Sequence, residues 1–180
     1  FHSLDSIQGE KISSIRCFEE MADGTIYIGT TGELCKIAAD NTLQVMDVDL
    51  NYVISMTHYA DMLIGCTNQG EVFILEDDRV IYTCTNENEE DYYTCVGLVD
   101  NRIIAGTSTD EIEELRIDNG KIQVVNRVNT APLLGIQEIE EDSTGKIWLA
   151  AENGLGYFTD DGLTIVPVKE FESSIENVHE

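Results

Sequence analysis

Apolar and polar residues alternate in short runs along most of this chain, which is the period of half-buried β-strands. The clearest example is the stretch from Ile136 to Phe158. There an alternating run at 136–141, an apolar run at 146–151 and a third run at 155–158 are separated by two turn sequences. The turns contain Gly145 and Gly154, and glycine is free to take the positive φ that tight turns need. The stretch therefore predicts three strands joined by tight turns.

The same unit occurs 121 positions earlier without a gap, so that Ile15 falls on Ile136 and Tyr27 on Trp148. Two weaker copies lie between these units. Steps of 36, 41 and 44 residues separate the anchor positions, which are Gly29, Gly65, Gly106 and Ala150. A repeat of about 40 residues with several strands in each copy is the sequence signature of a β-propeller.

The predicted fold class is all-β, a β-propeller fragment with four blades of four antiparallel strands and partial strands at both ends. Residues 1–180 form one propeller region, with blades expected at 12–48, 52–85, 93–127 and 136–168. Ser13-Ser14-Ile15 recurs as Ser173-Ser174-Ile175, an offset of four repeats. We therefore expect residues 1–7 and 173–180 to be stubs of neighbouring blades, with the chain an internal piece of a longer protein.

The residues from Ile139 to Leu155 read Ile-Glu-Glu-Asp-Ser-Thr-Gly-Lys-Ile-Trp-Leu-Ala-Ala-Glu-Asn-Gly-Leu. This sequence resembles the repeat of the two-component regulator propeller family. Residues 25–32 match the repeat with Tyr27 in place of Trp, whereas the fourth blade has Ala150-Ala151 in place of Gly-Thr. The resemblance is sharp in these two units and covers the rest of the chain only as a repeat.

That resemblance implies a non-catalytic sensor or ligand-binding segment from the extracytoplasmic half of a bacterial transmembrane receptor. The outputs of such receptors are histidine kinases or diguanylate cyclases, and they would lie outside this chain. The alternative is a protein-binding scaffold propeller without a membrane link, and a propeller lyase or hydrolase is a distant third. Fold analogy fixes neither the ligand nor its site.

The net charge of −25, from 35 acidic and 10 basic residues, works against binding nucleic acid or an anionic membrane, because both need cationic contacts. The partners left open are an unknown small molecule or glycan, or a protein. The parent is expected to be membrane anchored. The fragment itself is expected to self-associate through open blade edges, because bare strand edges invite pairing.

Candidate chemistry is sparse, so no catalytic, cofactor-binding or metal-binding residue is assigned, no cofactor is expected, and ligand-binding residues are unknown. The three histidines, His2, His58 and His179, share no ligand spacing. Acidic clusters could suit calcium, but they lack its loop pattern and are better interpreted as solvated faces. These clusters are Glu76–Asp78, Glu87–Asp91, Asp110–Glu114 and Glu138–Asp142.

The five cysteines fall in apolar strand sequences and are interpreted as small buried hydrophobes, with a disulfide between neighbouring strands left open. They are Cys17, Cys35, Cys66, Cys84 and Cys95. Trp148 could line a ligand site, but its place in the middle of a strand favours a core position. We expect Trp148 and Tyr27 to occupy equivalent places, largely buried between adjacent sheets.

Overall fold

A computed structural model describes residues 6–7, 10–11, 13–38, 42–159 and 162–167. The described residues form eighteen β-strands and no helix. Sixteen of the strands build four antiparallel sheets of four strands each, in which consecutive strands are neighbours. The predicted all-β propeller with four blades is therefore confirmed.

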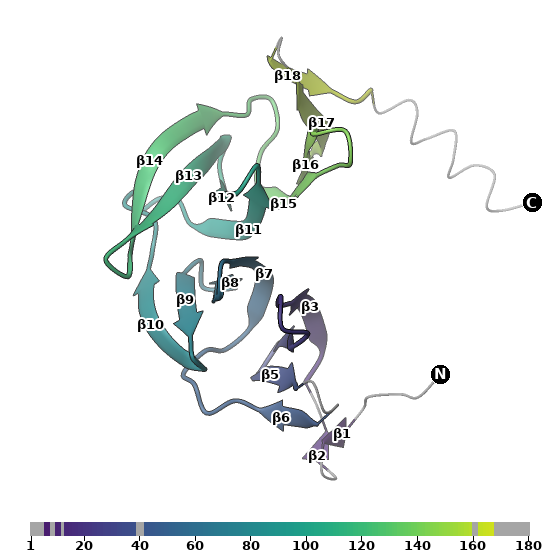
Figure 1. Cartoon of the computed structure of the whole chain (residues 1–180). Coiled ribbons are helices and arrows are strands. Elements are labelled where there is room, and N and C mark those ends of the chain that lie inside the picture. Colours follow the sequence, from purple (N-terminus) through teal and green to yellow (C-terminus); the bar gives the residue numbers. More distant parts are fainter. Residues whose placement is uncertain (1–5, 8–9, 12, 39–41, 160–161, 168–180) are drawn as a thin grey trace, which may run out of the picture.

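The four blades follow one another along the chain, each running from an inner strand to an outer strand (Figure 1). Blade 1 consists of β3 (Ile15–Glu20), β4 (Ile26–Thr30), β5 (Leu34–Ile37) and β6 (Leu43–Val45). Blade 2 consists of β7 (Val53–Tyr59), β8 (Met62–Thr67), β9 (Val72–Glu76) and β10 (Arg79–Cys84). Blade 3 consists of β11 (Tyr93–Val99), β12 (Arg102–Thr107), β13 (Glu111–Asp118) and β14 (Lys121–Asn129). Blade 4 consists of β15 (Ile136–Glu141), β16 (Ile147–Ala151), β17 (Gly154–Thr159) and β18 (Gly162–Ile165).

The two ends of the chain are described only in part. In the stub expected at 1–7, the described residues Ser6–Ile7 form β1, which pairs with β2 (Glu10–Lys11) as a separate two-stranded sheet. The stub expected at 173–180 lies outside the described residues.

The blades are arranged as an arc, with the inner strands β3, β7, β11 and β15 on its concave side (Figure 1). Each inner strand contacts the inner strand of the next blade. The arc stays open between blade 4 and blade 1 (Figure 1). Successive blades therefore bury apolar residues between their faces, and the core is divided into three clusters, one at each contact between blades.

Strand register gives a residue-by-residue alignment of the blades. Residues paired with the third position of the inner strand are Gly29, Cys66, Gly106 and Ala150. The anchor at Gly65 was therefore wrong by one position, although the shift of 121 between blades 1 and 4 holds. Gly65 is needed for another reason, since a Cβ there would lie 2.2 Å from the Phe73 ring.

The glycines at this position allow blade 1 to approach blade 2 closely, and blade 3 to approach blade 4. A Cβ on Gly29 would lie 2.9 Å from the Val53 carbonyl oxygen, and one on Gly106 would lie 2.9 Å from Ile136 Cβ. Val53 and Ile136 each begin the inner strand of the following blade. At these two contacts only a hydrogen fits between the sheets, whereas the contact between blades 2 and 3 accommodates Cys66 at this position. Blade 4 carries Ala150 at this place.

Candidate functional site

One edge of the arc carries the links between successive blades. In a four-stranded antiparallel blade, the turn between the second and third strands lies at the same edge as the link to the next blade. Loops carry binding residues more often than the strands that support them. We call this edge the loop edge; it comprises residues 31–33, 46–52, 68–71, 85–92, 108–110, 130–135 and 152–153.

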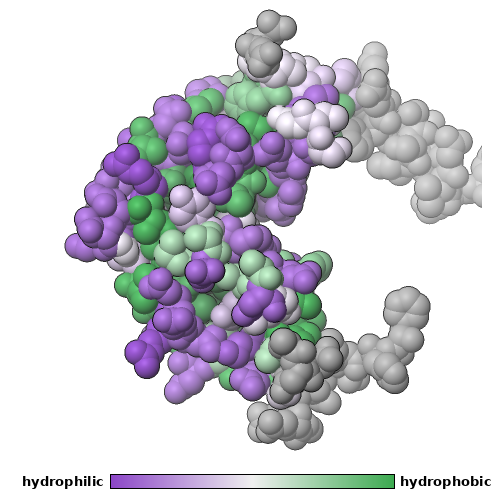
Figure 2. Space-filling model, viewed as in Figure 1, coloured by the Kyte–Doolittle hydropathy of each residue, from purple (hydrophilic) through white to green (hydrophobic). Residues whose placement is uncertain are grey.

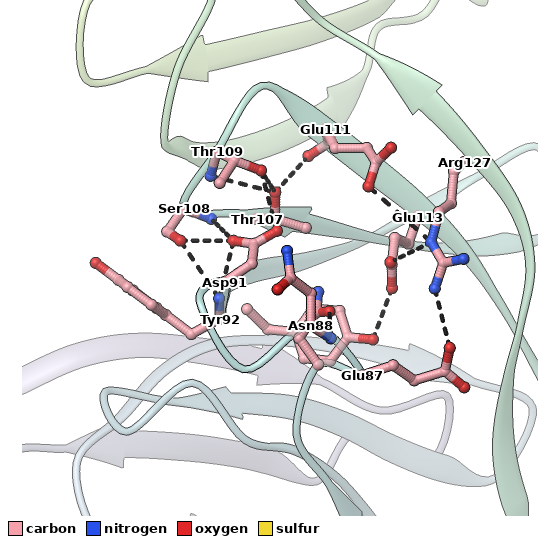
Figure 3. A network of polar contacts seen from close by, with 12 residues as sticks. Glu87, Asn88, Asp91, Tyr92, Thr107, Ser108, Thr109, Glu111, Glu113 and Arg127 are labelled. Carbon is pink, nitrogen blue, oxygen red and sulfur yellow. Dashed lines mark hydrogen bonds and ion pairs between the residues drawn. The ribbon is translucent and has the colours of Figure 1, made fainter.

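Two of these loops are held together by Asp91, whose side chain is 8% exposed. Its Oδ1 accepts hydrogen bonds from Ser108 Oγ at 2.6 Å and from the Tyr92 amide at 2.8 Å, and its Oδ2 accepts one from Thr109 Oγ1 at 3.0 Å (Figure 3). Thr107 Oγ1 lies 3.0 Å from Thr109 Oγ1 and extends the cluster. Because its oxygens already accept several donors, Asp91 orders the two loops and is a poor candidate for a free ligand-binding carboxylate.

A second polar cluster lies beside it in blade 3 and centres on Glu113, which is 1% exposed. Tyr93 Oη donates to Glu113 Oε2 at 2.7 Å, and Arg127 Nε donates to Oε1 at 2.8 Å. Arg127 also reaches Glu87 at 3.3 Å on the loop from blade 2 (Figure 3). Burial, followed by the hydrogen bond to Glu113, raises the pKa of Tyr93. The buried carboxylate therefore stays paired and links the loop to the outer strand β14.

Two tyrosines and a leucine at the loop edge lie near the starts of the inner strands. Tyr92, half exposed, directly precedes β11 and lies against the turn at Gly70. Tyr52 directly precedes β7, with φ of 54°, an uncommon conformation for a bulky residue. The Arg16 guanidinium lies 5.3 Å from the Tyr52 ring centroid and donates to its hydroxyl at 3.2 Å. Tyr52, Tyr92 and the half-exposed Leu134 lie next to the starts of the inner strands β7, β11 and β15, and we call these three residues the concave rim of the loop edge.

Among the described residues, the five cysteines and His58 offer no nucleophile at this edge. All five cysteines are free thiols, and three are buried. Burial raises the pKa of Cys17 and Cys95 to about 12 and that of Cys84 to about 11, so these thiols stay protonated near neutral pH. Cys95 Sγ donates to the Ile136 carbonyl at 3.4 Å, a contact between blades. His58 Nδ1 lies 2.6 Å from Glu19 Oε1 and joins blades 1 and 2.

The clefts formed by the described residues lie away from the loop edge, and two of them differ in character. One of about 330 Å³ between blades 1 and 2 is acidic, and its walls include Asp23, Asp61 and Asp78. Asp78 is already bound to Lys36 and accepts a hydrogen bond from Tyr27 Oη at 3.0 Å. The other, of about 180 Å³, lies between blades 3 and 4 and is mostly apolar. In the described part of the chain, no three His, Cys, Asp or Glu side chains converge as a metal site.

The structure revises what the sequence suggested about charged residues. The clusters at 87–91 and 110–114, interpreted as solvated faces, meet in the network of Figure 3. That interpretation is wrong for Asp91 and Glu113, which are buried. Reasoning from sequence missed this network because the partners Ser108, Thr109 and Arg127 come from other strands and turns.

Trp148 and Tyr27 occupy equivalent positions, as predicted, because Tyr27 pairs with Glu19 and Trp148 with Glu140. Tyr27 is buried, and Trp148 is partly buried and not exposed, so for Trp148 the expectation is wrong only in placing a second sheet against it. Its indole Nε1 donates to Asp142 Oδ2 at 2.9 Å within blade 4. Among the described residues no further blade lies against this side of blade 4.

Comparison with known proteins returned no matching family model and no matching curated relative. Many solved structures do match. The extracellular domain of BT3049 from B. thetaiotaomicron, assigned to a hybrid two-component system, aligns with a TM-score of 0.67 and 19% identity over 91% of this chain and 24% of that one. Virginiamycin B lyase from Staphylococcus aureus aligns with a TM-score of 0.65 and 15% sequence identity, over 84% of this chain and 55% of the lyase chain. The WD40 β-propeller domain of Doa1 aligns with a TM-score of 0.63 and 14% sequence identity, over 82% of this chain and 51% of the Doa1 domain.

This chain spans about a quarter of the BT3049 domain and about half of the other two proteins. The resemblance of the sequence to two-component regulator propellers is matched by this structural similarity to the extracellular domain of a two-component system. At these identities the similarity establishes the fold. The chain is a run of four consecutive β-propeller blades.

Proposed function

We propose that this chain is a non-catalytic, ligand-binding segment of an extracytoplasmic sensor propeller that belongs to a bacterial transmembrane signalling receptor. The observation that carries the proposal is the similarity of the whole arc to the extracellular domain of a two-component system. The repeat at residues 139–155 supports it independently, because it resembles the repeat of regulator propellers. The described residues include no helix of sufficient length and apolarity to cross a bilayer.

The proposed binding surface is the concave rim of the loop edge. Tyr52 and Tyr92 combine an apolar ring with a hydroxyl, a combination suited to uncharged ligands such as sugars or small organic molecules. The Asp91 cluster fixes the loop on which Tyr92 stands, so the ring is held in place before a ligand arrives. The net charge of −25 disfavours anionic ligands.

A thermal-shift screen of the chain against oligosaccharides and small metabolites tests the binding part of the proposal. A ligand that raises the melting temperature of the native chain should lose its effect with Tyr92→Ala and Tyr52→Ala. The matched control is Tyr82→Ala, which removes a tyrosine from the outer strand β10. Binding that survives both rim substitutions would contradict the assignment of the rim, and the control should bind like the native chain.

The receptor part is tested by the parent gene. We expect it to encode a membrane-spanning segment followed by a histidine kinase or diguanylate cyclase region. A parent that ends in further propeller repeats, with neither a span nor an output region, would instead favour the protein-binding scaffold. A lyase, the activity named for one structural neighbour, would be indicated by turnover of a ligand rather than reversible binding.

A further inference from the structure

Each contact between blades joins two different faces. We call the face that packs on the next blade the forward face, and the one that packs on the preceding blade the backward face. The central forward-face residues of blades 1 to 3 are Tyr27, Ile64 and Ile104, which are at most 8% exposed. On the backward faces of blades 2, 3 and 4, the inner strands make the contact. These strands begin with Val53, Tyr93 and Ile136, respectively. The chain therefore makes the same type of interface three times.

The forward face of blade 4 remains open among the described residues. Its central residue is Trp148, equivalent to Tyr27, with Tyr157 beside it at a ring distance of 4.8 Å. Lys146 Nζ lies 4.2 Å from the Tyr157 ring centroid and 5.3 Å from that of Trp148. The indole of Trp148 thus makes its hydrogen bond, its ring contact and its cation contact within its own blade. A half-buried aromatic pair stands where the other blades carry an interface.

The backward face of blade 1 is open in the complementary way. Ile15 is 49% exposed and Phe18 is 73% exposed. Their counterparts in blade 4, Ile136 and Ile139, are at most 2% exposed, and the counterparts in blades 2 and 3 are buried as well. Figure 2 shows hydrophobic residues at the surface where β3 borders the opening of the arc. Among the described residues, the apolar inner strand β3 therefore lacks the preceding sheet that covers its counterparts in the other blades.

We propose that a second copy of this chain docks head to tail on these faces, so that two arcs close into one ring of eight blades. The two free faces are the two halves of an interface that the chain already forms between its own blades. Four blades cover 51% of the WD40 β-propeller domain of Doa1, so two arcs supply about one complete propeller. A two-fold axis through such a ring uses both faces of both copies and leaves none open. This proposal does not rest on the proposed function. In a longer sensor propeller the neighbouring blades would take these two faces, and in the chain by itself the second copy takes them.

One contact in this ring differs from its internal counterpart. Between blades 1 and 2, Glu19 pairs with His58 at 2.6 Å. By register, Glu140 replaces Glu19 in blade 4, and Glu20 replaces His58 in blade 1. Two carboxylates would therefore meet across each junction between copies and weaken it. Glu20→His should restore the internal pairing and lower the dimer dissociation constant.

Light scattering coupled to size-exclusion chromatography tests the ring, with the single tryptophan as a second readout. The native chain should shift from the mass of one chain to that of two as its concentration rises. Trp148 lies on the docking face, so its emission should shift to the blue over the same concentration range. Phe18→Lys should raise the dissociation constant at least about tenfold, so the blue shift should disappear from the concentration range in which the native chain dimerises. Ile81→Lys, at an exposed apolar position on the outer strand β10, is the matched control.

Several outcomes would overturn the proposal. A chain that stays monomeric at every concentration, or a Phe18→Lys variant that dimerises like the native chain, would do so. An open series of larger oligomers would show that the arcs do not close. Tyr157→Lys separates head-to-tail docking from the pairing of two blade 1 faces, because only head-to-tail docking should be weakened by it. Failure of Glu20→His to strengthen the dimer would contradict the proposed register.

Discussion

The close approach of blades 3 and 4 provides the sharpest test of how the blades pack. Gly106→Ala places a methyl group 2.6 Å from Cys95 Sγ and 2.9 Å from Ile136 Cβ. Carbon atoms pack at about 3.5–4.0 Å, so blade 4 must move away by roughly 0.6 Å or more, or the inner strands must shift. Both side chains are fully buried, which leaves no flexible end to yield. Overpacking of this kind costs about 1–3 kcal/mol of the free energy of unfolding.

Urea denaturation followed by far-ultraviolet circular dichroism measures this loss. The control is Ala150→Gly at the equivalent position of blade 4, where no described blade follows. It should cost about 0.5–1 kcal/mol, the conformational cost of a strand glycine. Cys95→Ala combined with Gly106→Ala removes one of the two clashes and should recover part of the stability. If Gly106→Ala destabilises no more than Ala150→Gly, the close packing of blades 3 and 4 is refuted.

Three further predictions follow from named contacts. Tyr93→Phe removes a donor from the buried Glu113 carboxylate and should cost about 1–3 kcal/mol in urea denaturation; a neutral effect would contradict the buried pair. Trp148→Ala should cost about 1–3 kcal/mol, below the range of about 3–5 kcal/mol for a fully buried tryptophan, because the indole is half buried. Burial raises the pKa of the Cys95 thiol in the folded chain to about 12, compared with about 8.5 in the unfolded chain. The stability that comes from keeping this thiol protonated is therefore fully present below about pH 8.5 and is lost as the pH rises toward 12. Stability should therefore fall above pH 8.5 by about 1.4 kcal/mol per pH unit for this thiol, and Cys95→Ala should flatten that fall.

The repeat could be predicted from the sequence because each blade carries its own local signals. Alternation of apolar residues marks the strands, and Asn119-Gly120 forms a hairpin turn with both φ values positive. The shift of 121 residues between the first and fourth blades survives in the register of the paired strands. Gly65 was misaligned because it is adjacent to the true equivalent, Cys66, which replaces glycine there and donates to the Tyr93 carbonyl at 3.4 Å.

The burial of individual side chains could not be predicted in the same way, because it depends on neighbouring blades. Tyr27 and Trp148 are equivalent in sequence, yet within the described part of the chain a following blade lies against Tyr27 and none lies against Trp148. Asp91 and Glu113 lie in acidic runs that look solvated, but donors from separate strands and turns surround them. Pairings of this kind are fixed by the packing of whole sheets and leave no periodic signal in the chain.

Nuclear Overhauser contacts between inner strands test the order of the blades most directly. The Val96 amide lies 3.1 Å from Ser55 Oγ, and a Cβ on Gly97 would lie 3.2 Å from Ile139 Cβ. An isotope-labelled chain should therefore show cross-peaks from Val96 to the Ser55 methylene and from Gly97 to the Ile139 side chain. Both cross-peaks would establish that blades 2, 3 and 4 pack in sequence, face to face. Native strand chemical shifts without these cross-peaks would contradict the propeller arrangement.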